Sequence, residues 1–95
     1  MDDKQAIEAA KSAIADLFGG EGATQISFEE IEFDEADRQW RVAIDFYRPR
    51  TNLEAHLFGN NAAALAPRYR RDRRVVTIAD ADGRVLSVKE PLGYG

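Results

Sequence analysis

A run of arginines is the feature of this 95-residue chain with the clearest chemical potential. An arginine side chain donates paired hydrogen bonds to a carboxylate or a phosphate, so such a run can bind an acidic protein surface or a nucleic acid. Nucleic-acid binding also calls for several stacking aromatic side chains, and this run contains a single tyrosine. We therefore favour contact with a protein partner or a second copy of the chain over contact with a nucleic acid. The candidate contact residues are Arg68, Tyr69, Arg70, Arg71, Arg73 and Arg74.

The charges of the chain are divided between its two halves. Residues 1–37 carry eleven acidic side chains and two lysines, whereas residues 38–95 carry six acidic and eleven basic ones. These halves can neutralise each other within one fold or across a dimer, so arginines that are solvated or paired within the chain remain an alternative to a binding surface. The acidic run can likewise be solvated or receive the arginines of a neighbouring subunit. That run consists of Glu29, Glu30, Glu32, Asp34, Glu35 and Asp37.

Other residue types that carry chemistry are few. His56 is the only histidine, and acid–base work there would need a partner that the sequence does not place beside it, so His56 is a candidate binding residue only. The segment 80–83 resembles a calcium loop. If Gly83 takes the sixth position of that loop, however, Ile78 and Lys89 fall where ligands are required. The chain contains no cysteine. We expect no catalytic residues, no metal and no cofactor.

The apolar pattern predicts one helix and four strands in a single domain of 95 residues. Residues 3–18 show helical spacing, with Asp2 or Asp3 as the N-terminal cap. Gly19-Gly20 is expected to end the helix, because glycine takes the left-handed conformation that a C-terminal cap needs. Period-two alternation and an Asp-Gly turn predict the strands. The strands are residues 24–33 (with a bulge at 29–30), 39–48, 69–79 and 84–89.

These elements predict an α+β fold, in which the N-terminal helix packs on a four-stranded antiparallel sheet in the order α-β-β-(loop/short α)-β-β. Residues 50–67 are expected to form a partly helical, mobile loop. Leu86 and Val88 of the last strand are expected to point into the core.

The chain combines an alanine-rich helix at 6–18, a Trp-x-Val-x-Ile strand at 40–44 and a closing hairpin at 76–85. Together these three segments resemble PepSY-like domains, which are small α+β modules of peptidase propeptides and other proteins. The resemblance implies an inhibitory or regulatory interaction domain without catalytic residues of its own. The chain differs from that family in the insertion at 50–67 and in lacking an export signal. Through the stretches Arg48-Pro49-Arg50-Thr51 and Arg68-Tyr69-Arg70, the chain is also loosely similar to accessory proteins of gas-vesicle assembly.

We thus expect a cytoplasmic, non-enzymatic interaction domain that contacts a protein partner or itself through the arginine-rich strand and loop 50–67. No apolar run is long enough to cross a membrane, and the N-terminus does not look like a signal peptide. One alternative is a domain that binds or converts a small molecule in a pocket between helix and sheet, lined by Trp40, Phe46 and Tyr47. Another is nucleic-acid binding through the arginines.

Overall fold

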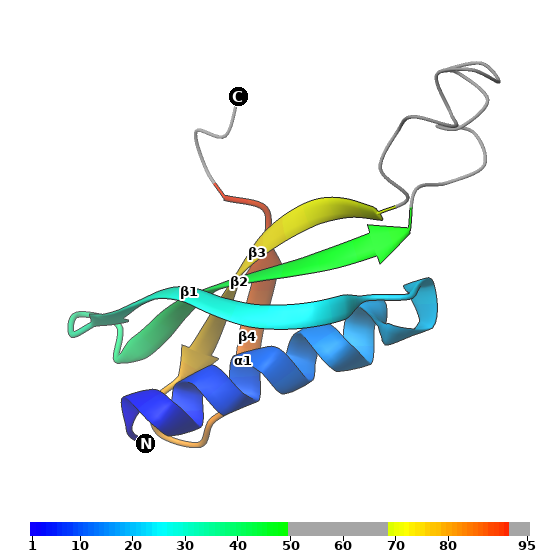
Figure 1. The fold of residues 1–95 in the computed structure, drawn as a ribbon. Helices are drawn as coiled ribbons and strands as arrows, with labels where there is room; N and C mark the ends of the chain where they lie inside the picture. The colour runs from blue at the N-terminus through cyan, green and yellow to red at the C-terminus, as the bar shows by residue number, and fades with distance from the viewer. Residues whose placement is uncertain (50–68, 92–95) are drawn as a thin grey trace, which may run out of the picture.

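One helix packs against one face of a four-stranded antiparallel sheet in the computed structural model, which describes residues 1–49 and 69–91 (Figure 1). This arrangement confirms the predicted α+β fold. His56, Arg68 and the loop 50–67 lie outside the described residues. The elements in chain order are α1 (Asp3–Phe18), the short 3-10 helix η1 (Gly19–Glu21), β1 (Thr24–Asp34), β2 (Gln39–Pro49), β3 (Tyr69–Ala79) and β4 (Val85–Lys89).

Helix α1 begins and ends where the sequence predicts, and only the conformation of its C-terminal cap differs from the prediction. The side chain of Asp2 accepts a hydrogen bond from the backbone of Gln5, and the side chain of Gln5 accepts one from the backbone of Asp2. This capping box satisfies two of the free amides at the start of the helix. At the other end Gly19 keeps right-handed helical angles, and it is Gly22, after η1, that takes the left-handed conformation with φ of 82°. The prediction that Gly19-Gly20 supplies the left-handed cap was therefore wrong, because the left-handed glycine is Gly22, which follows the short helix η1.

The core forms where α1 meets the two central strands. Alternate residues of β2 face the helix, as do alternate residues of β3, because successive side chains of a strand point to opposite faces. Two of the three buried helix residues are alanines, whose small side chains let the helix approach the sheet closely. The fully buried apolar residues are Ala6, Ala10 and Ile14 of α1, Val42, Ile44 and Phe46 of β2, and Val76 and Ile78 of β3.

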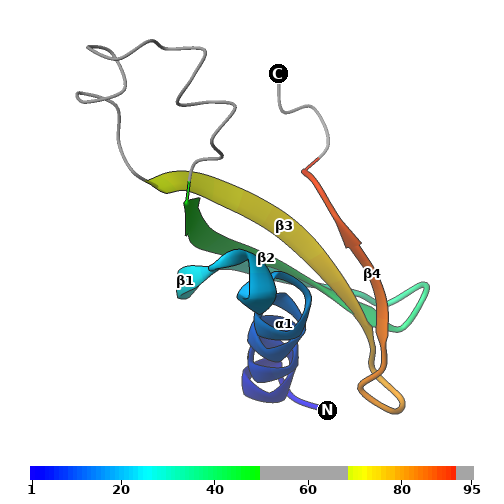
Figure 2. The same ribbon diagram turned by 90° about the vertical axis from the view of Figure 1, so that its right-hand side faces the viewer.

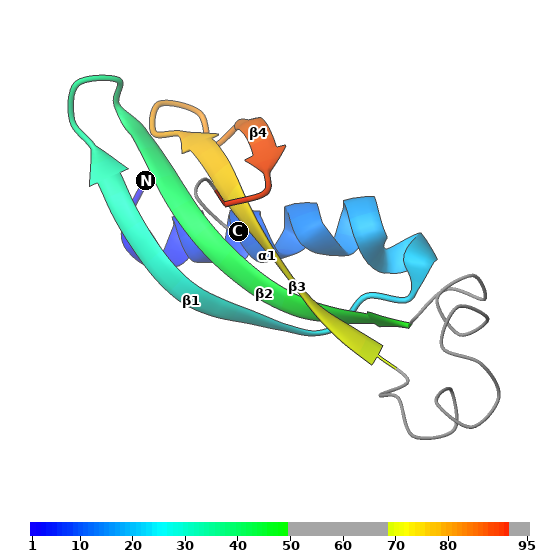
Figure 3. The ribbon, with the colours of Figure 1, turned by 90° about the horizontal axis from the view of Figure 1, so that it is seen from above.

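The four strands lie side by side in chain order, so β1 and β4 form the two edges of the sheet (Figure 3). The pairing of β1 with β2 shifts register between Phe28 and Glu30, which confirms the predicted bulge. Strand β3 is longer than β4, whose partners on β3 run only from Val75 to Ile78.

The closing hairpin differs from its prediction at one residue. Gly83 has φ of 74°, as the turn requires. Thr77 then pairs with Ser87, but Ile78 pairs with Val85, so Leu86 is an extra residue on β4. A bulge of this kind redirects the side chain, and Leu86 is 44% exposed rather than buried. The prediction for Leu86 was wrong, whereas Val88 packs against the core as expected.

The second face of the sheet is left uncovered by the described elements. Figure 2 shows α1 on one side of the strands and no other described helix or strand on the opposite side. We call this side the open face; it carries the residues that alternate with those of the core.

Candidate functional site

Strand β3 divides the arginine run between the two faces of the sheet. Arg71 and Arg73 alternate with the core positions and so belong to the open face, whereas Arg70 and Arg74 lie on the side of Val76. The candidate residues that the sequence placed together therefore form two separate groups. Tyr69, at the start of the strand, is 48% exposed.

On the open face, Arg71 and Arg73 enclose the carboxylate of Asp45 from β2. Arg73 donates to this carboxylate through Nε at 2.6 Å and through a terminal nitrogen at 3.1 Å. Arg71 donates through Nε at 2.9 Å and through its own terminal nitrogen. The Asp45 side chain is only 4% exposed, and both of its oxygens accept hydrogen bonds from these arginines. Sequence reasoning missed Asp45, because only the register of β2 and β3 places it opposite Arg73.

The charge of Asp45 is stabilised by this arrangement. The hydrogen bond from Arg73 is the main cause that lowers the pKa of Asp45 below its ordinary value of 3.8; burial opposes it and Arg71 adds to it. Asp45 is therefore ionised at neutral pH. Two cations around one buried carboxylate leave a net positive charge, and Glu29 of β1 compensates for part of it at 3.7 Å from Arg71 and 4.0 Å from Arg73.

On the helix side, Asp72 and the ring of Phe18 organise the remaining arginines. Arg48 donates to Asp72 at 2.6 Å, and this hydrogen bond is the main cause that raises the pKa of Arg48. The guanidinium groups of Arg48 and Arg74 lie 5.3 Å and 5.2 Å from the centre of the Phe18 ring. Such cation–π contacts extend the core beyond the end of α1. Arg70 also lies 3.6 Å from Asp72.

Every arginine of the run that the structure describes thus lies within 4.0 Å of a carboxylate of the same chain. Pairing within the chain, one of the alternatives that the sequence left open, is present in the structure. A phosphate backbone would have to compete with these carboxylates. The described part of the arginine run, from Arg70 to Arg74, is a neutralised network rather than a free positive patch.

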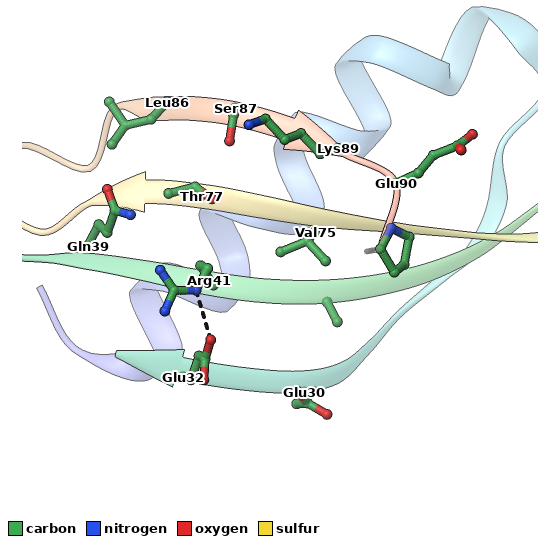
Figure 4. A pocket seen from close by; sticks show the side chains of 12 residues that line it. Glu30, Glu32, Gln39, Arg41, Val75, Thr77, Leu86, Ser87, Lys89 and Glu90 are labelled. Atoms are coloured by element: carbon green, nitrogen blue, oxygen red, sulfur yellow. Dashed lines mark hydrogen bonds and ion pairs between the residues drawn. The ribbon is translucent and has the colours of Figure 1, made fainter. Parts of the chain in front are cut away.

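Further along the open face, a shallow hollow of about 710 Å³ extends across all four strands (Figure 4). The two central strands contribute the small side chains of Ala43, Val75 and Thr77 together with the longer Gln39 and Arg41, and the edges carry further charged residues. The lining residues are Glu30, Glu32, Gln39, Arg41, Ala43, Val75, Thr77, Leu86, Ser87, Lys89, Glu90 and Pro91. The volume lies within the range of small-molecule sites, but none of these residues is aromatic, and such sites are mostly lined by apolar and aromatic side chains.

Two rows of residues cross the hollow, and in each row every strand contributes one residue that is paired with its neighbour on the next strand. We call them the Glu30 row and the Glu32 row. Their members follow from the pairing of the strands: Glu30–Ala43–Val75–Lys89 in the first, and Glu32–Arg41–Thr77–Ser87 in the second.

The two rows differ in how their charges are satisfied. In the Glu32 row, Arg41 donates to Glu32 at 2.8 Å and also reaches Asp34 at 3.0 Å. In the Glu30 row, neither Glu30 nor Lys89 has an ionic partner among the described residues, and the apolar side chains of Ala43 and Val75 lie between them. The Glu30 row therefore presents an acid and a base, on opposite edges of the sheet, that are available to a partner.

The pocket expected between helix and sheet is not formed by the residues named for it. Phe46 is fully buried in the core and Trp40 packs against that core. Tyr47 belongs to the open face, opposite Arg71. The hollow lies on the other side of the sheet from the predicted pocket.

Comparisons with known proteins give no family and no structural relative. No protein-family model matches the chain, and no curated protein or solved structure is significantly similar to it. Over residues 1–49 and 69–91, no helix is both long and apolar enough to cross a membrane. Within the same residues, no group of three or more His, Asp or Glu side chains is arranged to hold a metal ion.

Proposed function

We propose that this chain is a non-enzymatic protein-interaction domain and that it contacts its partner through the open face of the sheet. The contact would include the hollow and, at one end of the same face, Arg71 and Arg73. This keeps the arginine-rich strand in the contact region and adds the neighbouring strands to it.

The observation that carries the proposal is the composition of the Glu30 row. Ala43 and Val75 form an apolar centre that no described element covers, and it is flanked by Glu30 and Lys89, whose charges have no ionic partner in the described part of the chain. Protein interfaces commonly combine an apolar centre with a polar rim. Leu86 adds an exposed apolar side chain at the edge of the hollow.

The arginines contribute in a different way from that first expected. Because Arg71 and Arg73 already hold Asp45, they serve a partner as a rigid, ion-paired end of the surface rather than as free cations. Arg71 is 56% exposed and can still donate to a partner's carbonyl or carboxylate groups. A variant that removes both arginines would also leave the fold with an unpaired buried carboxylate, so it is a poor test of binding.

Charge reversals outside that network test the proposal. We suggest Glu30→Lys and Lys89→Glu on the open face, with Glu8→Lys and Lys4→Glu on exposed positions of α1 as controls that change the net charge by the same amounts. A tagged chain is cross-linked in extract of the source cells, and the bound proteins, including an untagged copy of the chain, are identified by mass spectrometry. We expect the open-face variants to lose a partner that the wild type and the controls retain. A partner retained equally by all five proteins would contradict the proposal.

A further inference from the structure

The open face is complementary to itself, and this property identifies a partner. We propose that a second copy of this chain docks on the open face, with a two-fold axis that runs parallel to the strands between β2 and β3. The inference rests on the proposed function, since it names the occupant of the same surface. It would produce a sandwich of two sheets about 10 Å apart, with α1 of each copy on the outside.

The order of residue types in the Glu30 row carries the argument. From β1 to β4 the row reads acid, small apolar, apolar, base. A two-fold axis along the strands reverses this order in the second copy, because β1 then faces β4 and β2 faces β3. Glu30 meets Lys89 of the partner subunit, and Ala43 meets Val75 of the partner subunit. Each contact occurs twice, since the interface is symmetric.

The Glu32 row is compatible with the same axis. Glu32 then faces the hydroxyl of Ser87 in the second copy, and Arg41 faces the hydroxyl of Thr77. A hydroxyl can donate to a carboxylate, and Arg41 can donate to a hydroxyl oxygen. Neither row places like charges opposite each other.

The other two-fold axis in the plane between the sheets runs across the strands, and the charges disfavour it. It would place β1 over β1 and β4 over β4. Glu30 and Glu32 would then lie against the acidic strand β1 of the second copy. Lys89 would lie against strand β4 of the second copy, which carries the same lysine. Like charges brought together at an interface oppose association. The charge pattern thus selects both the occupant and its orientation.

The size of the surface sets the expected strength of the dimer. Four strands spaced about 4.8 Å apart give a face about 15–20 Å wide. The eleven residues of β2 and of β3, at about 3.4 Å each, make the face at most about 37 Å long, so its area is about 550–750 Å². This is slightly less than the roughly 800 Å² that stable interfaces bury on each partner. We therefore expect association in the micromolar range, and the experiment has to cover chain concentrations from about one to several hundred micromolar.

Sedimentation equilibrium of the charge reversals tests the inference. We expect the wild type to form dimers, and Glu30→Lys and Lys89→Glu each to raise the dissociation constant about tenfold or more, because each introduces two like-charge contacts. The two variants mixed in equal amounts should associate again as a mixed dimer. At one of its two contacts the lysine introduced at position 30 faces the glutamate introduced at position 89, and at the other the native Glu30 faces the native Lys89. The double variant should dimerise to within about threefold of the wild type.

Sedimentation equilibrium of the two α1 variants provides the control, and the same experiment defines the results that would contradict the inference. Glu8→Lys and Lys4→Glu should leave the dissociation constant unchanged. A wild type that stays monomeric over the whole range, or a dimer that is insensitive to both open-face reversals, would overturn the inference. A monomeric wild type whose captured partner is nevertheless lost with Lys89→Glu would overturn the inference and leave the proposed function intact, so the two ideas fail separately.

Discussion

Replacing Asp45 with asparagine should destabilise the fold, because the substitution keeps the shape of the side chain and removes its charge. The Asp45 carboxylate, 4% exposed, accepts four hydrogen bonds from Arg71 and Arg73. A hydrogen bond to a charged group contributes about 1.5–3 kcal/mol. The two arginines are 56% and 37% exposed and can turn to water once the charge is lost. The expected loss therefore corresponds to about one such bond, or about 2 kcal/mol.

Urea unfolding followed by the fluorescence of Trp40, the only tryptophan, measures this loss. All samples should be compared at one low chain concentration, so that association contributes equally to each. In a domain of this size, about 2 kcal/mol corresponds to a fall in Tm of about 10 °C. Glu35→Gln, at an exposed turn position, is the matched control and should change the free energy of unfolding by less than about 0.5 kcal/mol.

The pH dependence gives a second, independent check on Asp45. Its pKa in the folded protein is lowered from 3.8, so its contribution to stability is complete above that ordinary value and is lost as the pH falls through the lower, folded pKa. The difference in unfolding free energy between wild type and Asp45→Asn should thus be constant near neutral pH and shrink below about pH 4. A variant within about 0.5 kcal/mol of the wild type at pH 7, with no change in acid sensitivity, would refute the reasoning.

Two further substitutions test the packing of the helix and the turn that follows it. Ile14→Ala, at a fully buried position, should lower the free energy of unfolding measured in urea by about 2–5 kcal/mol. Leu17→Ala, at a position 56% exposed, should lower it by less than about 1 kcal/mol. Equal losses would contradict the assignment of the Ile14 side of α1 to the core. Gly22→Ala should lower the free energy of unfolding by about 1–3 kcal/mol, because φ is 82° there and a Cβ would lie 2.9 Å from Pro49. Gly20→Ala, with no atom within 4 Å of its Cβ, should be nearly neutral, and a loss as large as that of Gly22→Ala would show that the left-handed turn is placed wrongly.

Local patterns in the sequence were sufficient to predict most of the fold. The helical spacing that includes Ile14 indicates one buried face of α1, and the alternation that includes Ile44 and Phe46 indicates one buried face of β2. These two faces meet in the core. Such periodicity is a property of a single segment, so it can be recognised without knowing its neighbours. Leu86 shows the limit: its direction depends on an extra residue in the pairing of β3 with β4, and no local pattern reports that register.

The candidate site depended more heavily on contacts between distant segments. The arginines were recognisable as a cluster, but their division between two faces and their pairing with Asp45 and Asp72 follow from strand alternation combined with register. The Glu30 row was not predictable for the same reason. Glu30 and Lys89 are 59 positions apart in the sequence, and three strand pairings bring them into one line.

The most direct test of the open face as the contact surface is a filtered nuclear Overhauser experiment on a dimer of mixed labelling, in which one copy carries ¹³C and the other does not. The account predicts cross-peaks between the methyl group of Ala43 in one copy and the methyl groups of Val75 in the other. These two side chains are neighbours on adjacent strands of each chain, and the isotope filter removes that internal contact. A demonstrably dimeric sample without these cross-peaks, or with intermolecular cross-peaks only from residues of α1, would contradict the account.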